Sequence, residues 1–199
     1  MKSAYHVLED EKNLMKSRQR GEGSNSSCAV NNRSVVWHKL WKLSCQPRVC
    51  HFLWRLARNS LAFKMNIQRR GVQLDTRCPV CHRLDEDGGH CFLKCKLVKR
   101  WWSTLSLEPV RQQMLSKQSA WEVVTEILSL KEEVRTKTVL FLWKWWTERN
   151  KINKGEKGQG VDGVAANVLN LLNYLSKLER KEPIRQTAGN ARWKAPPPG

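Results

Sequence analysis

A short stretch rich in cysteine and histidine constrains the fold of this chain more than any other part of its sequence. From Cys78 to Cys95, eighteen residues hold four of the seven cysteines and two of the five histidines. Thiolate and imidazole are ligands that zinc prefers in proteins, and structural zinc sites hold the ion with four of them in tetrahedral geometry. Two pairs of such side chains at close spacing are typical of a zinc site.

The predicted zinc ligands are Cys78, Cys81, His90 and Cys95. Pro79 stiffens the turn that places the first two sulfurs on one side of the ion. Because protein side chains fill all four positions, the predicted site is structural and leaves no place for a catalytic water. His82 and Cys91 lie next to predicted ligands, and the spacing does not exclude either of them.

Zinc at such a site contributes enough free energy to decide folding. In zinc-finger peptides it stabilises the folded form by about 10–16 kcal/mol at neutral pH, more than the total stability of many domains. We therefore expect that removal of the metal unfolds residues 70–105. The alternative is a loop of ordinary thiols that does not respond to chelation. The remaining cysteines, Cys28, Cys45 and Cys50, have no histidine at a useful spacing, and we expect them to be buried or idle thiols.

Apolar residues recur at helical spacing along most of the chain, so we predict a mainly α fold. The expected architecture is a small helical domain with a structural zinc-binding segment, followed by extra helices and a disordered tail. No stretch shows a convincing strand alternation. The predicted segments are 1–33, a mobile N-terminal segment and linker; 34–107, the zinc-binding domain; 120–150, a helical segment; 151–163, a Gly-rich linker; 164–180, a helix; and 181–199, a disordered Pro-rich tail.

The ten tryptophans mostly fall on apolar helical faces. We predict that these pack in the core rather than stack on bases: Trp37, Trp41, Trp54, Trp143 and Trp146. Trp102 lies beside a basic run, and its pattern leaves both roles open. We expect the helix that contains it to end at Pro109.

Positive charge dominates the composition, with 36 Lys and Arg against 18 Asp and Glu, a net charge of +18. Such a chain favours polyanions, nucleic acid first. No acidic residue occurs between Gly23 and Leu74 or between Gly88 and Leu107. From these two runs we predict phosphate contacts by Arg48, Arg55, Arg58, Arg69, Arg70, Lys94, Lys96, Lys99 and Arg100.

Nothing in the sequence predicts an enzyme or a membrane protein. The one dense acidic cluster, Asp85 to Asp87, lies in the expected finger loop, where we expect solvated side chains. No apolar run reaches the roughly 18 residues of a membrane span, and the first residues lack the apolar region of a signal peptide. We therefore expect an intracellular protein, in the nucleus or the cytoplasm, without a membrane partner.

Three stretches of the chain resemble a known family. In order, they read "MKSAYHVLED", "VWHKLWKLSCQPRVCHFLWRLARNSLAFKMNIQRRGV" and "CPVCHRLDEDGGHCFLKCKLVKRWW". Together they are similar to the reverse-transcriptase zinc-binding domain of plant non-long-terminal-repeat (LINE-type) retrotransposon polyproteins. The family's metal ligands carry over to the four positions predicted above. The sequence departs from the family in His82, where Gly is frequent.

The resemblance also implies a context. "LFLWKWWTERNKINKGE" is similar to the segment that follows this domain, and "RWKAPPPG" resembles the lead-in to RNase H. The chain is therefore expected to be a fragment that lies between polymerase and RNase H and contains neither. The family implies a zinc-stabilised helical module that helps a retroelement polyprotein hold its template or target.

The expected function is a non-catalytic zinc-binding module that binds RNA or DNA through phosphates. Two alternatives stay open. The first alternative is a protein-interaction scaffold that docks on other retroelement polyprotein domains. The second is a retroelement relic without a selected function.

Overall fold

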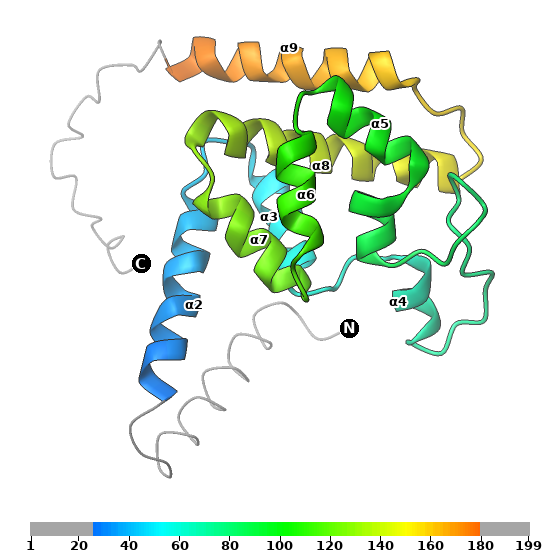
Figure 1. Cartoon of the computed structure of the whole chain (residues 1–199), viewed down its shortest axis with the longest axis horizontal. Helices are drawn as coiled ribbons and strands as arrows, with labels where there is room; N and C mark the ends of the chain where they lie inside the picture. Colours follow the sequence, from blue (N-terminus) through cyan, green and yellow to red (C-terminus); the bar gives the residue numbers. More distant parts are fainter. Residues whose placement is uncertain (1–25, 180–199) are drawn as a thin grey trace, which may run out of the picture. The chain divides into compact units, whose positions relative to one another are not determined.

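The structure, a computed structural model, describes residues 26–179 (Figure 1). Within that range it is mainly helical and has no β-strand, which confirms the predicted fold class. Most of the predicted N-terminal segment and the predicted tail, 181–199, lie outside the described residues. The helices are α2 (Ser26–Trp41), α3 (Pro47–Ala57), α4 (Lys64–Gln68), the π-helix η1 (His90–Lys94), α5 (Lys96–Thr104), α6 (Glu108–Leu115), α7 (Ala120–Ser129), α8 (Glu132–Asn153) and α9 (Val161–Glu179).

The chain divides into two units, residues 1–42 and residues 43–199. Helix α2 belongs to the first unit and begins at Ser26, earlier than the expected end of the linker, because no Gly or Pro interrupts these residues. Val36 and Leu40 are buried, whereas Trp41 is 52% exposed. The prediction that Trp41 packs in a core is therefore wrong. Val36 and Leu40 are four residues apart and therefore share one face of the helix. Trp41, five residues after Val36, points away from that face.

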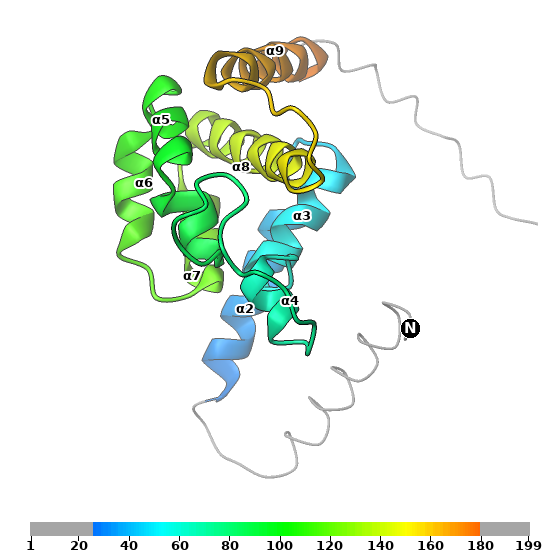
Figure 2. The same ribbon diagram turned by 90° about the vertical axis from the view of Figure 1, so that its right-hand side faces the viewer.

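Helix α8 is the central helix of the second unit. It packs against α3, α7 and α9, and Figure 2 shows it running between α3 and α5. Two edge-to-face ring contacts join it to α5: Trp145 with Trp101, 5.0 Å between centroids, and Phe141 with Trp102, 4.9 Å. Consecutive residues of α8 are buried, as expected for a helix that is covered on several sides.

The tryptophans divide differently from the prediction. Trp101, Trp102 and Trp145 are at most 1% exposed, so Trp102 belongs to the core and cannot stack on a base. Trp143 and Trp146, which we predicted as core residues of α8, are half-buried. Trp145 takes the central place because α8 is covered on more than one side, and a single apolar stripe does not describe it.

The segment between α5 and α8 contains more helix than predicted. The helix expected to end at Pro109 ends earlier, at Thr104, and Pro109 instead lies in the first turn of α6, which begins at Glu108. The missing N–H of proline has no cost there. The predicted helical segment 120–150 is two helices, separated by Leu130 in an extended conformation. Ser119 caps α7 by accepting the Glu122 N–H at 3.2 Å, a signal that the sequence does carry.

Helix α9 packs on α8 and α5 through three buried residues, Val164, Ala165 and Val168. The Gly-rich connection is shorter than predicted, since α8 continues to Asn153 and α9 starts at Val161. A buried carboxylate of α8, Glu148, accepts the backbone N–H of Gln159 and holds this connection against the core. None of the described helices is long and apolar enough to cross a membrane.

Candidate metal centre

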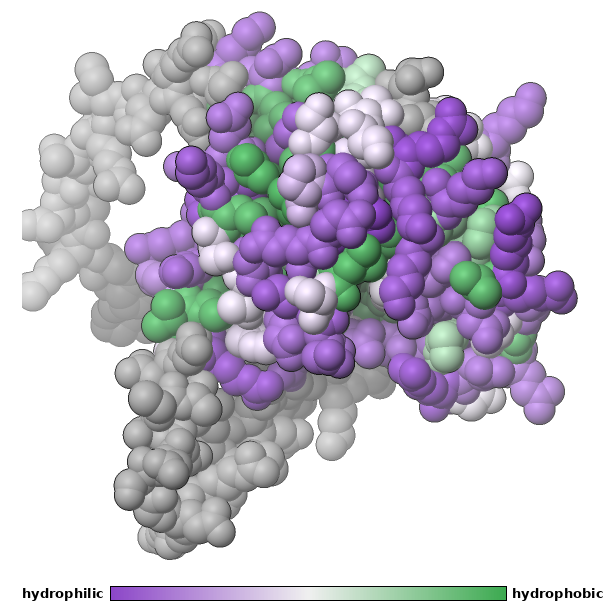
Figure 3. Space-filling view, in the orientation of Figure 1, coloured by the Kyte–Doolittle hydropathy of each residue, from purple (hydrophilic) through white to green (hydrophobic). Residues whose placement is uncertain are grey.

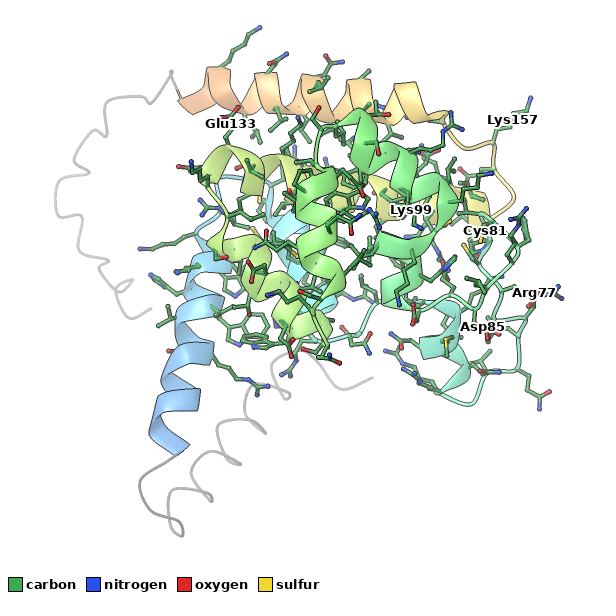
Figure 4. All side chains as sticks on the ribbon, in the orientation of Figure 1. Arg77, Cys81, Asp85, Lys99, Glu133 and Lys157 are labelled. Carbon is green, nitrogen blue, oxygen red and sulfur yellow. The ribbon has the colours of Figure 1, made fainter. Side chains whose placement is uncertain are left out.

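A short hairpin-like loop positions the first two predicted ligands. Its ends pair through an antiparallel bridge between Arg77 and Asp85, and Cys78 N–H donates to Leu84 O at 2.8 Å. Inside the loop, His82 N–H donates to Cys78 O at 2.9 Å. These bonds close the turn after Cys78. Figure 4 shows Cys81 on this loop, with Arg77 and Asp85 beside it.

The other two predicted ligands lie at the two ends of η1. Cys95 N–H donates to His90 O at 2.9 Å, a bond between residues five apart that defines a π-helical turn. An α-helix has about 3.6 residues per turn and would place residue 94, not Cys95, above His90. At the start of the turn, Asp87 Oδ1 accepts His90 N–H at 2.5 Å. The wider turn therefore brings the imidazole and the last sulfur to the same side.

Side chains from three helices hold η1 in place. A helix end leaves backbone carbonyls without a partner, and buried ones must be satisfied. Here the next three carbonyls accept from buried side chains: Trp145 Nε1 donates to Cys91 O at 2.8 Å, Trp102 Nε1 to Phe92 O at 2.8 Å, and Arg111 Nη1 to Leu93 O at 2.9 Å. The turn that carries two predicted ligands is thus part of the same core as α5, α6 and α8.

The structure brings the four predicted ligands together. The ligand atoms of Cys78, Cys81, His90 and Cys95 all lie within 4.8 Å of one another, and Cys81 Sγ is 3.3 Å from His90 Nε2. Three of the four side chains are buried. Zn–S bonds of about 2.3 Å in a tetrahedron place sulfurs about 3.8 Å apart, so the cluster needs only a small contraction around an ion. Three sulfurs and one imidazole nitrogen at this separation fit zinc.

The two rival ligands lie outside this cluster. His82 is exposed and has a positive φ of 54°. The thiol of Cys91 is buried in the protein core, where burial raises its pKa well above the usual value. Its sulfur is not among the ligand atoms that converge within 4.8 Å of one another. Cys45 and Cys50 contact each other, with 3.5 Å between sulfurs, and burial raises the pKa of Cys45 to about 12.

Two sulfurs of the cluster, those of Cys78 and Cys95, interact through a hydrogen bond. The hydrogen bond between Cys78 and Cys95 is the largest cause of both shifts: it raises the pKa of Cys78 and lowers that of Cys95. The backbone N–H groups of Leu97 and Val98, at the start of α5, lower the pKa of Cys95 further. Because zinc binds thiolates, binding of the ion by these cysteines would release protons.

Glu86 corrects the expectation that the acidic cluster is solvated. Its side chain is 0% exposed and forms an ion pair with Arg149 of α8, whose side chain is 4% exposed. Arg149 Nε donates to Glu86 Oε1 at 2.6 Å, and Lys64 N–H donates to Glu86 Oε2 at 3.1 Å. Glu86 therefore joins the metal-site loop to α4 and α8. The sequence carries no local signal for this pair, because Arg149 lies beyond the aromatic run of α8, three residues after Trp146.

The nine predicted phosphate contacts come from four elements of the second unit. All are exposed except Arg55, which is half-buried. Arg48, Arg55 and Arg58 belong to α3 and its end, Arg69 and Arg70 follow α4, Lys94 ends η1, and Lys96, Lys99 and Arg100 lie on α5. Most of the arginines on α3 and after α4 already have partners within the chain. Arg48 donates to Gln46 and lies over Trp143, Arg55 donates to Ser60 O, Arg58 lies over Trp54, and Arg69 donates to Asn66.

Comparison with known proteins gives one family match. A family model described as zinc-binding in reverse transcriptase matches residues 1–102, just over half of the 199 residues. No curated protein and no solved structure matches the chain significantly.

Proposed function

Because this chain belongs to the family of zinc-binding domains in reverse transcriptase, we propose that it is a non-catalytic module that binds nucleic acid and needs zinc to fold. One observation carries the proposal: exposed cations directly flank the metal-site cluster. Lys94 and Lys96 stand on either side of Cys95, and both are exposed. The metal would fix the loop and η1, and through them the position of these charges.

The role of zinc follows from how the cluster is built. Four protein side chains converge on one point, which describes a structural site. The Cys78 and Cys81 turn comes from one side of that point and η1 from the other. An ion bound there would cross-link two segments of the second unit and add directly to its folding free energy.

Family membership supports a more specific origin. The three matching stretches of sequence favour a plant LINE-type retrotransposon polyprotein, and we propose that the chain corresponds to the part between its polymerase and RNase H domains. In that setting the module would hold RNA or DNA for the polymerase. Phosphate contacts by Lys and Arg suit this task because they give affinity without sequence preference.

A scaffold role is a second candidate, supported by a different observation. Helix α9 exposes two large apolar side chains, Leu169 at 46% and Tyr174 at 56%. A contiguous exposed apolar patch is a feature of docking surfaces for other proteins, and these two side chains are its candidate members on α9. Oligomers detected by light scattering without nucleic acid would favour this role.

The test is fluorescence anisotropy of labelled single-stranded RNA and duplex DNA with the zinc-loaded protein, across a salt series. We expect saturable binding that weakens steeply with salt. The Cys78→Ser, Cys81→Ser double variant and chelated wild type should lose it, together with circular dichroism signal and protease resistance at residues 70–105. The double variant keeps the net positive charge, so it is a matched control for charge alone.

Equal binding by the wild type and the double variant would contradict the proposal, since any chain with a charge of +18 would then serve. Charge reversal at Arg55 is a poor test. Its Nη2 donates to Ser60 O at 3.1 Å, so the substitution would also disturb the end of α3.

A further inference from the structure

Helix α5 has two distinct faces. One face is buried and consists of Val98, Trp101, Trp102 and Leu105. The opposite face is exposed and carries polar residues at i, i+3, i+4, i+7 and i+8: Lys96, Lys99, Arg100, Ser103 and Thr104. This face therefore presents cations in its first half and hydroxyls in its second half.

A groove runs along this face at the start of α6. It has a volume of about 530 Å³ and is lined by Lys99, Arg100, Ser103, Thr104, Glu108 and Arg111. In Figure 3 the corresponding face of the molecule is largely hydrophilic, and Figure 4 labels Lys99 on α5. No aromatic side chain lines the groove, so it has no platform for a base.

The groove is cationic, because its one carboxylate is already paired. Arg111 donates to both oxygens of Glu108, at 2.8 Å and 2.5 Å, and Gln112 donates to Oε1 at 2.7 Å. The hydrogen bonds from Arg111 lower the pKa of Glu108 and keep it ionised. Lys99 and Arg100, by contrast, make no side-chain hydrogen bond or ion pair within the described part of the chain, although the charge of Lys99 also lowers the pKa of Glu108. With three cations and one carboxylate among its lining residues, the groove keeps a net positive charge for a ligand.

Helix α5 itself offers these two cations no acidic partner. Lys99 and Arg100 are the fourth and fifth of its nine residues, and its first turn holds no acidic residue. Three thiolates and one neutral imidazole around a divalent ion carry a net charge of about −1. That charge accounts for Lys94 and Lys96 beside Cys95. Lys99 and Arg100 lie a turn further along, at the groove.

The hydroxyls complete an anion site. Ser103 Oγ donates to Lys99 O at 3.2 Å, and Thr104 Oγ1 donates to Arg100 O at 2.9 Å. A hydroxyl rotates freely, so each of them can turn its hydrogen toward a bound oxygen. Two cations and two hydroxyl donors match the phosphate oxygens of a nucleic-acid strand.

We propose that this groove between α5 and α6 is the site where the nucleic-acid backbone binds, with Lys99 and Arg100 as its phosphate contacts. The inference rests on the proposed function and narrows it, since it assigns binding to α5 rather than to the partnered arginines of α3. A site of this kind reads the backbone and not the bases, so RNA and DNA of any sequence should bind alike within each strand type.

The test is the Lys99→Gln, Arg100→Gln double variant of the full zinc-loaded chain, measured by anisotropy on duplex DNA across a salt series. Loss of two phosphate contacts should reduce the slope of log K against log[salt] by about 1.8 and weaken binding about 60-fold at 0.1 M salt. The matched control is Lys154→Gln, Lys157→Gln, which removes the same charge at two exposed positions after α8. It should leave the slope within a few tenths of wild type.

Each outcome has a distinct meaning. If the wild type binds and the groove variant keeps its slope, the groove proposal is wrong and the proposed function stands. If both double variants weaken binding equally, net charge alone is responsible and the groove proposal is wrong as well. If the wild type shows no saturable, salt-dependent binding, both proposals fail. The groove variant should keep its zinc and its melting temperature, because both side chains are exposed and neither makes a hydrogen bond or ion pair within the described residues.

Discussion

His82 occupies a backbone conformation that suits glycine better. Its φ of 54° lies in the left-handed region, and its N–H closes the turn on Cys78 O. The related family often has Gly here, and the structure supplies the physical reason: a side chain in this conformation costs about 1–2 kcal/mol, which Gly avoids. The exposed imidazole is not needed for the cluster of four ligand atoms.

We therefore expect His82→Gly to keep full zinc content and to raise the free energy of unfolding by about 0.5 kcal/mol, the strain relieved minus the extra chain entropy of Gly. His82→Ala is the matched control, because it removes the same imidazole and keeps the strain. Urea denaturation and metal analysis check both. A loss of zinc in both variants would identify His82 as a ligand, whereas we expect that loss only for His90→Ala.

Between elements, the most consequential contact is the ion pair of Glu86 and Arg149. It is almost completely buried and joins the metal-site loop to α8 across 63 positions of sequence. Arg149 also lies over Trp146, 5.1 Å from the ring centroid. A buried ion pair contributes little more to the folding free energy than apolar residues of similar volume would. Removal of only one partner, however, leaves an uncompensated charge in the core.

Arg149→Met should therefore lower the free energy of unfolding by about 3–5 kcal/mol. The double variant Glu86→Gln, Arg149→Met should lose less than the sum of the two single variants, because no buried charge remains. Arg77→Met is the control: its pair with Asp75 is exposed and screened by solvent, so its loss should leave the free energy of unfolding almost unchanged. Urea denaturation of zinc-loaded protein measures all four. Additive losses for Glu86 and Arg149 would contradict a coupled pair.

At the scale of the whole molecule, the family match ends inside the folded core. It stops at residue 102, within α5, yet η1 takes hydrogen bonds from Arg111 of α6 and Trp145 of α8. The second unit accordingly extends well beyond the matched residues. The metal site is thus supported by helices that the family model does not cover.

A chain that ends at residue 107 should not fold, even with zinc. It loses two of the three donors to η1, and it exposes to water the apolar faces of Trp101 and Trp102 that α8 covers, so most of the core that stabilises the metal-site segment is gone. A chain that ends at residue 160, which lacks only α9 of the described helices, is the control and should keep its zinc. Circular dichroism and tryptophan fluorescence distinguish the two. A folded, zinc-binding chain of 107 residues would contradict this prediction.

The sequence by itself determined the local features of this protein. The spacing of three cysteines and one histidine predicted the cluster that the structure assembles, because ligands so near in sequence need only a turn and one wide helical turn to meet. Helices with one buried face, such as α3, were also predictable, since one-sided burial leaves a regular apolar period.

Only the tertiary structure decided what depends on distant partners. Helix α8 is covered on several sides, so its sequence has no single apolar stripe and does not reveal Trp145 as its central tryptophan. The burial of Glu86 depends on Arg149, 63 residues away, and the freedom of Lys99 and Arg100 depends on Arg111 occupying Glu108. Local spacing describes the side of a helix on which a residue lies, but the charge or ring that it meets there comes from another part of the chain.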